Sequence, residues 1–171
     1  MAVKHAVIRT DLMAGTKVPA ALRSFRYFDS NGDLAEIDNG CVVALDSIIV
    51  DSQGNEPNRE VWKAVAPTAS TPLSKLAIVA TPELLYDERL RNLTDFYNDT
   101  DHPARGYMPK SGDIFSVTAE ALDGTPAKGS GVALQAKVQL KVGTYTAGTS
   151  FGKIISKETV NGLDFFVIQV D

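Results

Sequence analysis

Acidic side chains are concentrated in one stretch of this 171-residue sequence. Residues 83–101 carry six carboxylates and two arginines, a net charge of −4 that equals the charge of the whole chain. Paired carboxylates can serve a glycosidase as acid and as nucleophile or base. However, Tyr86, Leu90 and Leu93 follow a helical period, which places most of the acids on the opposite, solvated face. We therefore expect these acids to form a solvated helix face. A small β-barrel hydrolase using residues 83–101 is the alternative. The six acids are Glu83, Asp87, Glu88, Asp95, Asp99 and Asp101.

Two short acidic motifs contain the oxygen ligands that a hard cation prefers. In Asp29–Asp33 (DSNGD) the glycine stands earlier than in an EF-hand loop, so this motif predicts a tight turn. Asn98–His102 (NDTDH) has oxygen ligands at alternating positions and could hold a cation weakly. The chain contains only 2 histidines, which excludes a three-histidine zinc site. We expect no metal and no other cofactor.

The candidate nucleophiles lack the partners that their chemistry requires. Gly148–Gly152 (GTSFG) matches the nucleophile elbow of α/β-hydrolases, but a strand-like segment follows it and no histidine lies beyond His102. Cys41 opens an apolar run, which is typical of a cysteine packed in a core. The sequence has no glycine-rich phosphate-binding motif. This inventory predicts a protein that is not an enzyme.

Length, charge and composition predict one soluble domain over residues 1–171. The formal charge of −4 and the scattered basic residues argue against nucleic acid as a partner. The N-terminus lacks the pattern of a signal peptide, and no apolar run approaches the roughly 20 residues of a membrane span. We therefore expect a protein that is made in a cytoplasm and has no membrane partner.

Alternating and β-branched runs dominate the sequence and predict a mainly β fold, either a small barrel or a sandwich. The clearest runs are Val132–Val142, Cys41–Val50 and Lys75–Ala80. Asn161-Gly162 lies between two strand-like halves of the last segment. Because both residues accept positive φ angles, this pair predicts a type I′ hairpin turn.

One segment departs from the β pattern. Pro82 suits the first position of a helix, where its missing N–H would have no partner in any case. Together with the apolar stripe, it predicts one α-helix over about residues 82–97. A long loop, over roughly residues 98–112, then leads back to the β pattern.

Four segments resemble a group of small structural proteins of tailed bacteriophages, the head decoration or cement proteins. The segments are AVIRTDLMAGT, YDERLRNLTDFYND, ARGYMPKSGDIFSVTAEAL and TVNGLDFFVIQVD, and the resemblance extends over most of the chain. It implies a non-enzymatic virion protein that binds the outside of a capsid, often as a trimer or dimer, and stabilises contacts between capsid subunits. The implied partners are the major capsid protein and further copies of the same chain. The implied location is the capsid surface, after synthesis in the host cytoplasm.

Polar and aromatic side chains near the N-terminus and in the long loop are the candidates for capsid or subunit contacts, because exposed aromatics suit an interface anchor. Residues 1–16 either form an arm that adds a strand to a neighbour or are the first strand of their own sheet. A tail- or fibre-associated binding module is the alternative function within a phage. The candidate contact residues are His5, Arg9, Tyr97, Asp99, His102, Arg105 and Tyr107.

Overall fold

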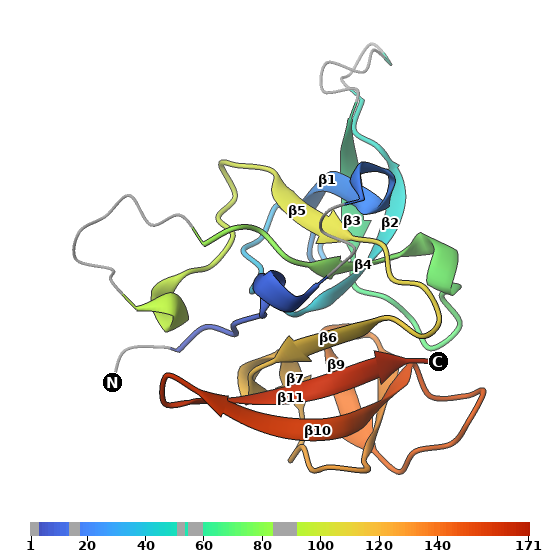
Figure 1. Cartoon of the computed structure of the whole chain (residues 1–171). Helices are drawn as coiled ribbons and strands as arrows, with labels where there is room; N and C mark the ends of the chain where they lie inside the picture. The colour runs from blue at the N-terminus through green and yellow to red at the C-terminus, as the bar shows by residue number, and fades with distance from the viewer. Residues whose placement is uncertain (1–3, 14–17, 51–53, 55–59, 84–91) are drawn as a thin grey trace.

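The computed structural model describes residues 4–13, 18–50, 54, 60–83 and 92–171, and it confirms the predicted mainly β fold. Among these residues, one group of strands closes a barrel and a second group forms a sheet beside it (Figure 1). The chain completes the barrel before it enters the second sheet, so the two halves of the fold follow one another in the sequence.

The barrel has the strand order β1-β3-β2-β4-β5 and closes where β5 pairs with β1. The β1–β3 pair is parallel, and the other pairs of the barrel are antiparallel. Its strands are β1 (Leu22–Tyr27), β2 (Val42–Ile48), β3 (Val61–Val65), β4 (Leu76–Val79) and β5 (Ala104–Tyr107). The runs predicted at Cys41–Val50 and Lys75–Ala80 contain β2 and β4.

The second sheet has the order β6-β11-β10-β8-β9-β7. Its strands are β6 (Ile114–Val117), β7 (Leu122–Asp123), β8 (Gly131–Gln135), β9 (Lys137–Gly143), β10 (Gly152–Val160) and β11 (Leu163–Val170). The predicted hairpin at Asn161-Gly162 is confirmed, with φ of 51° and 78° at the two turn residues between β10 and β11. The single strand predicted over Val132–Val142 is corrected, because the chain reverses at Ala136 and β8 pairs antiparallel with β9.

Strand β4 explains how the two halves pack on each other. All four of its side chains are buried, and successive side chains of a strand point to opposite faces. Leu76 and Ile78 belong to a hydrophobic cluster that also contains Val117 and Ile168 of the second sheet, the shared core. Ala77 and Val79 belong to a cluster inside the barrel, the barrel core, which includes Cys41. Because both faces of β4 are buried, its sequence is a continuous apolar run rather than an alternating one.

Short 3-10 turns are the helical elements of the described residues: η1 (Thr10–Leu12), η3 (Pro19–Ala21), η4 (Leu73–Lys75), η5 (Leu93–Asp95) and η6 (Ala119–Ala121). The helix predicted over 82–97 is corrected at both described ends. Pro82 and Glu83 are not helical, and Leu93–Asp95 form a single 3-10 turn that Asn92 and Asp95 close as a capping box. The middle of that prediction, residues 84–91, lies outside the described residues.

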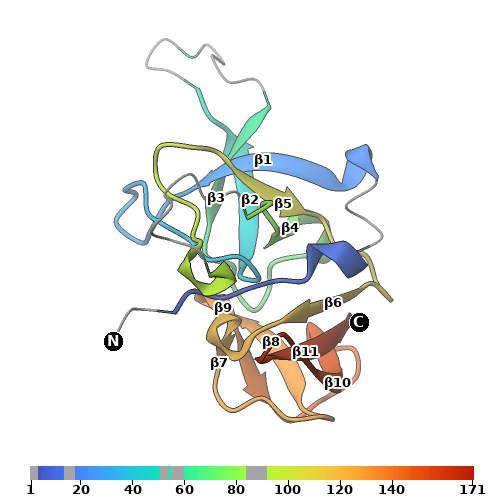
Figure 2. The same ribbon diagram turned by 60° about the vertical axis from the view of Figure 1, so that its left-hand side comes forward.

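The N-terminal segment, residues 4–13, lies between the barrel and β6 of its own chain (Figure 2). Ile8 pairs with Val117, and Val7 exchanges hydrogen bonds with Thr118 through its N–H and its carbonyl oxygen. Ala6, Val7 and Ile8 are buried. The described part of the predicted arm therefore packs on its own molecule.

Candidate interaction surface

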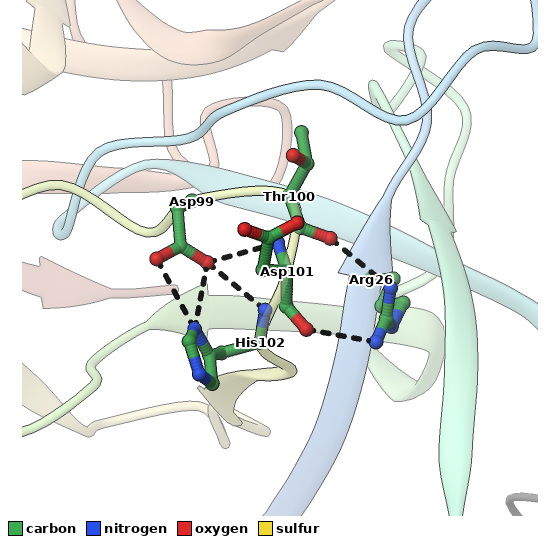
Figure 3. Close-up of polar contacts among 5 residues, drawn as sticks. All are labelled: Arg26, Asp99, Thr100, Asp101 and His102. Carbon is green, nitrogen blue, oxygen red and sulfur yellow. Dashed lines mark hydrogen bonds and ion pairs between the residues drawn. The ribbon is translucent and has the colours of Figure 1, made fainter.

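The loop Asn98–Pro103 precedes β5 and is tied together by one carboxylate (Figure 3). The Asp99 Oδ1 atom accepts hydrogen bonds from the backbone N–H groups of Asp101 and His102, both at 2.9 Å, and lies 3.0 Å from Nδ1 of the His102 ring. Desolvation acts to raise the pKa of Asp99, but these hydrogen bonds outweigh it and hold the pKa below its ordinary value. Asp99 therefore acts as the clamp of the turn.

Arg26, on β1, holds the same loop from the barrel side. Its guanidinium donates to the carbonyl oxygens of Thr100 and Asp101, each at 3.0 Å (Figure 3). A planar guanidinium fixes two acceptors at once, so the loop has little freedom relative to the barrel. The His102 side chain is 81% exposed on this fixed support.

Two buried amides anchor the start of the loop. Asn98 and Ile37 exchange backbone hydrogen bonds, and the Asn98 side chain donates to the carbonyl oxygen of Ile37 and to Oδ1 of Asn39. Asn39 in turn donates to the carbonyl oxygen of Thr81 and to Oε1 of Glu83, and accepts from the N–H of Thr81. The Asn98 side chain is thus directed inward, away from any cation that the NDTDH motif would bind.

His5 and Tyr97 form a stacked pair beside this loop. Their ring centroids lie 4.8 Å apart with an interplanar angle of 29°. His5 Nδ1 lies 2.7 Å from Oδ1 of Asp38, whose second oxygen accepts from the backbone N–H of Ala6. Because Asp38 adjoins the Asn39 anchor in the chain, the stack and the loop share one support. We call His5, Asp38, Tyr97, Asp99 and His102 the docking surface.

The other three predicted contact residues lie outside this group. Arg9 pairs with Asp11 at 2.7 Å and lies 5.9 Å above the Phe165 ring. Arg105, on β5, is exposed. Tyr107 is only 6% exposed and belongs to the shared core, so its prediction as an exposed aromatic is corrected. Burial, together with its hydrogen bond to Asp113, raises the pKa of Tyr107 to about 12.

Three of the four described carboxylates of the acidic stretch take local structural roles, and the fourth, Asp101, is exposed. Glu83 accepts from Asn39, Asp95 accepts from the N–H and side chain of Asn92, and Asp99 clamps its turn. Asp87 and Glu88 lie outside the described residues. In the part of the chain that the structure describes, no three His, Cys, Asp or Glu side chains form a group able to hold a metal ion.

The two candidate nucleophiles also have structural surroundings. The GTSFG motif leads into strand β10, and Ser150 Oγ accepts a hydrogen bond from the N–H of Thr146 within a turn. Cys41 is 3% exposed in the barrel core, and burial raises the pKa of its thiol. A thiol that remains protonated in an apolar core is a packing group.

Sequence reasoning missed Arg26, Asp38 and Asn39, which position the docking surface. Asn39 had a local signal only as the first residue of an Asn-Gly turn; Gly40, with φ of 82°, makes that turn. A Cβ at Gly40 would lie 2.8 Å from Val117, so the backbone passes close to the second sheet here. The contacts of Arg26 and Asp38 join residues more than 30 positions apart, a pairing that no local motif predicts.

Comparisons with protein-family models, with curated proteins and with solved structures find no match to this chain. Within the described residues, no helix has the length and apolar character needed to cross a membrane.

Proposed function

We propose that this protein is a head decoration protein of a tailed bacteriophage, which binds the outside of the capsid and stabilises contacts between capsid subunits. Two lines of support come together in this proposal. The first is the resemblance of four sequence segments to such proteins. The second, which carries the proposal, is a partly exposed set of polar and aromatic side chains that the fold holds rigidly from behind.

Rigidity matters because docking costs conformational entropy. Ordering a free side chain or loop on binding costs about 0.5–1.5 kcal/mol for each side chain. In the docking surface, Asp99 clamps the turn, Arg26 fixes the loop, and His5 is held by both Asp38 and Tyr97. Much of this cost is therefore met during folding, before the protein meets a capsid.

The chemistry of the docking surface suits a protein partner. The stacked rings of His5 and Tyr97 form a rigid, amphipathic anchor, the kind of group that dominates protein interfaces. Asp99 and the exposed His102 provide a polar rim beside it. Each copy would contribute a modest affinity, and many copies on one shell would add their contributions.

A binding experiment with capsids tests this proposal directly. Purified protein is mixed with capsids of the matching phage that lack it, and bound protein is measured by co-sedimentation and located by electron cryomicroscopy. We expect saturable, stoichiometric density on the outer face of the shell and a higher capsid melting temperature. Capsids that gain neither density nor thermal resistance would contradict the proposal. Density on tails instead would indicate a tail-associated module.

A further inference from the structure

A groove at the start of β1 has a volume of about 520 Å³. It is formed by the residues around η3, by η4 and by the segment that follows β5. The apolar lining includes Val18, Leu73 and Met108, and Val18 is 48% exposed. Such an apolar groove at the surface is suited to receive a hydrophobic side chain from a partner.

The groove is also positively charged, although the chain as a whole carries −4. Its charged lining residues among those described are Arg23 and Lys110. Within the described residues, Arg23 donates to the carbonyl oxygens of Ala20 and Leu22 through Nη1. The Asp113 carboxylate lies near Lys110, but it accepts the Lys110 backbone N–H and the Tyr107 hydroxyl. In the described part of the chain no carboxylate forms an ion pair with Arg23 or Lys110, so a negatively charged partner could pair with both cations.

The opposite end of β1 has the complementary features. The loop between β1 and β2 contains Asp33, Leu34, Ala35 and Glu36 in sequence, and all but Ala35 are exposed. Leu34 is 41% exposed, and the flanking carboxylates of Asp33 and Glu36 have no ion-pair partner in the described part of the chain. An exposed leucine between two free acids matches an apolar groove that carries two cations.

We propose that this acidic loop of one copy binds the groove of a second copy, with Leu34 in the apolar part and the acids near Arg23 and Lys110. Because β1 separates loop and groove by about 20 Å, one molecule cannot satisfy its own groove. The contact is therefore head-to-tail. A heterologous contact of this kind builds rings when the rotation closes and open chains when it does not. The inference does not depend on capsid binding.

Charge-reversal variants at exposed positions test this contact in solution. The groove variant carries Ser74→Glu and Lys110→Glu, and the loop variant carries Asp33→Lys and Glu36→Lys. Each variant retains one intact half of the contact. A control variant with Glu60→Lys and Glu120→Lys makes the same charge change as the loop variant at exposed sites elsewhere. Circular dichroism and thermal melts confirm that every variant is folded.

Sedimentation velocity gives the readout, from about 1 μM to about 1 mM protein. We expect the wild type and the control to associate reversibly, more weakly at high salt because the charges are screened. The groove variant alone and the loop variant alone should each associate at least about tenfold more weakly than the wild type. An equimolar mixture of the two variants should associate more strongly than either variant alone. The intact loop of the groove variant meets the intact groove of the loop variant, and the reversed loop and reversed groove again carry opposite charges. A wild type that stays monomeric throughout, or a mixture that stays monomeric while the wild type associates, would overturn the proposal.

Discussion

Asn39 and Asn98 form a hydrogen bond in the protein interior, with Nδ2 of Asn98 donating to Oδ1 of Asn39 at 3.2 Å. The two side chains come from the segments before β2 and before β5, and their residues are 0% and 5% exposed. Each amide also satisfies backbone groups of a neighbouring segment. Together with Arg26 on β1, this pair attaches the docking surface to the barrel.

Replacing Asn39 should destabilise the protein. Asn39→Ala removes an acceptor of the buried Asn98 amide and the partners of the N–H and carbonyl oxygen of the half-buried Thr81. A buried polar group left without a partner costs about 1–3 kcal/mol, and we expect a loss of that size in the free energy of unfolding. Chemical denaturation measures it. The control Asn31→Ala, at an exposed turn, should change stability by less than about 0.5 kcal/mol. Equal losses for both variants would show that Asn39 is not an important anchor.

The barrel interior should not tolerate a methyl group at Gly106. A Cβ at this position on β5 would lie 2.8 Å from the Cβ of Ala77 and 3.1 Å from the Phe25 ring. Overpacking of this kind costs about 1–3 kcal/mol, which Gly106→Ala should show as a lower denaturation midpoint. Gly143→Ala is the matched control, because nothing lies within 4 Å of its Cβ. A Gly106→Ala variant as stable as this control would show that the barrel is loosely packed.

Glu83 should make stability depend on pH. Burial raises the pKa of its carboxyl above the ordinary 4.5, although the hydrogen bond from Asn39 acts in the opposite direction. Above pH 4.5 the unfolded chain loses this proton first, so the contribution of Glu83 to stability falls as pH rises toward its folded-state pKa.

Glu83→Gln keeps an acceptor for Asn39 but cannot ionise. We therefore expect the variant to melt at a higher temperature than the wild type at neutral pH, with the difference shrinking as pH falls toward about 4. Melting curves of both proteins over this range give the difference directly. Glu120→Gln, at an exposed site, controls for the loss of one negative charge; a difference that grows toward acid pH would mean that the sign is wrong.

Cys41 should report on opening of the barrel. Its thiol is buried and its pKa is raised by burial, so a disulfide reagent should label the native protein slowly. In denaturant the labelling should become as fast as for a free thiol. Labelling rates measured across a denaturant series check this. Fast labelling under native conditions would mean that the barrel opens far more readily than its closed strand order indicates.

Tyr97 should contribute to capsid binding if the proposed docking surface is the contact. Tyr97→Ala removes half of the stack with His5, and an anchor of this type contributes about 2 kcal/mol or more to binding. Co-sedimentation should then show an affinity lower by at least about tenfold. Tyr145→Ala, on the second sheet side, is the aromatic control. If Tyr145→Ala lost affinity and Tyr97→Ala did not, the result would indicate that the capsid contact lies on the second sheet.

The sequence predicted those features that depend on neighbouring residues. Alternation and β-branching identify β2 and β4, and Asn161-Gly162 identifies the last hairpin because its backbone needs positive φ angles. The same alternation continues in phase from Gln135 to Lys137, so nothing local marks the reversal at Ala136. The C-terminal part of the predicted helix is wrong for another reason. Asp95 accepts a hydrogen bond from Asn92, and the two residues close a single 3-10 turn there.

The docking surface could be predicted only in part, for the same reason. Residue type alone points to His5, Tyr97, Asp99 and His102 as contact candidates. The structure stacks His5 on Tyr97 and places Asp99 within 3.0 Å of the His102 ring. Arg26, Asp38 and Asn39 act across long separations in the chain. The closure of the barrel, which brings β1 against β5, makes Arg26 a neighbour of the loop, and the bridge between Ile37 and Asn98 brings Asn39 to it.

The hydrogen bonds between Val7 and Thr118 span 111 residues. During synthesis the N-terminal segment leaves the ribosome first, yet its partner strand β6 emerges only after the whole barrel has been made. Until then the apolar side chains of Ala6, Val7 and Ile8 cannot be buried against β6. Contacts of such long range slow folding, because the chain must close a large loop before they form. The segment around Ala6, Val7 and Ile8 is thus a place where a chaperone would have a long time to act on the nascent chain.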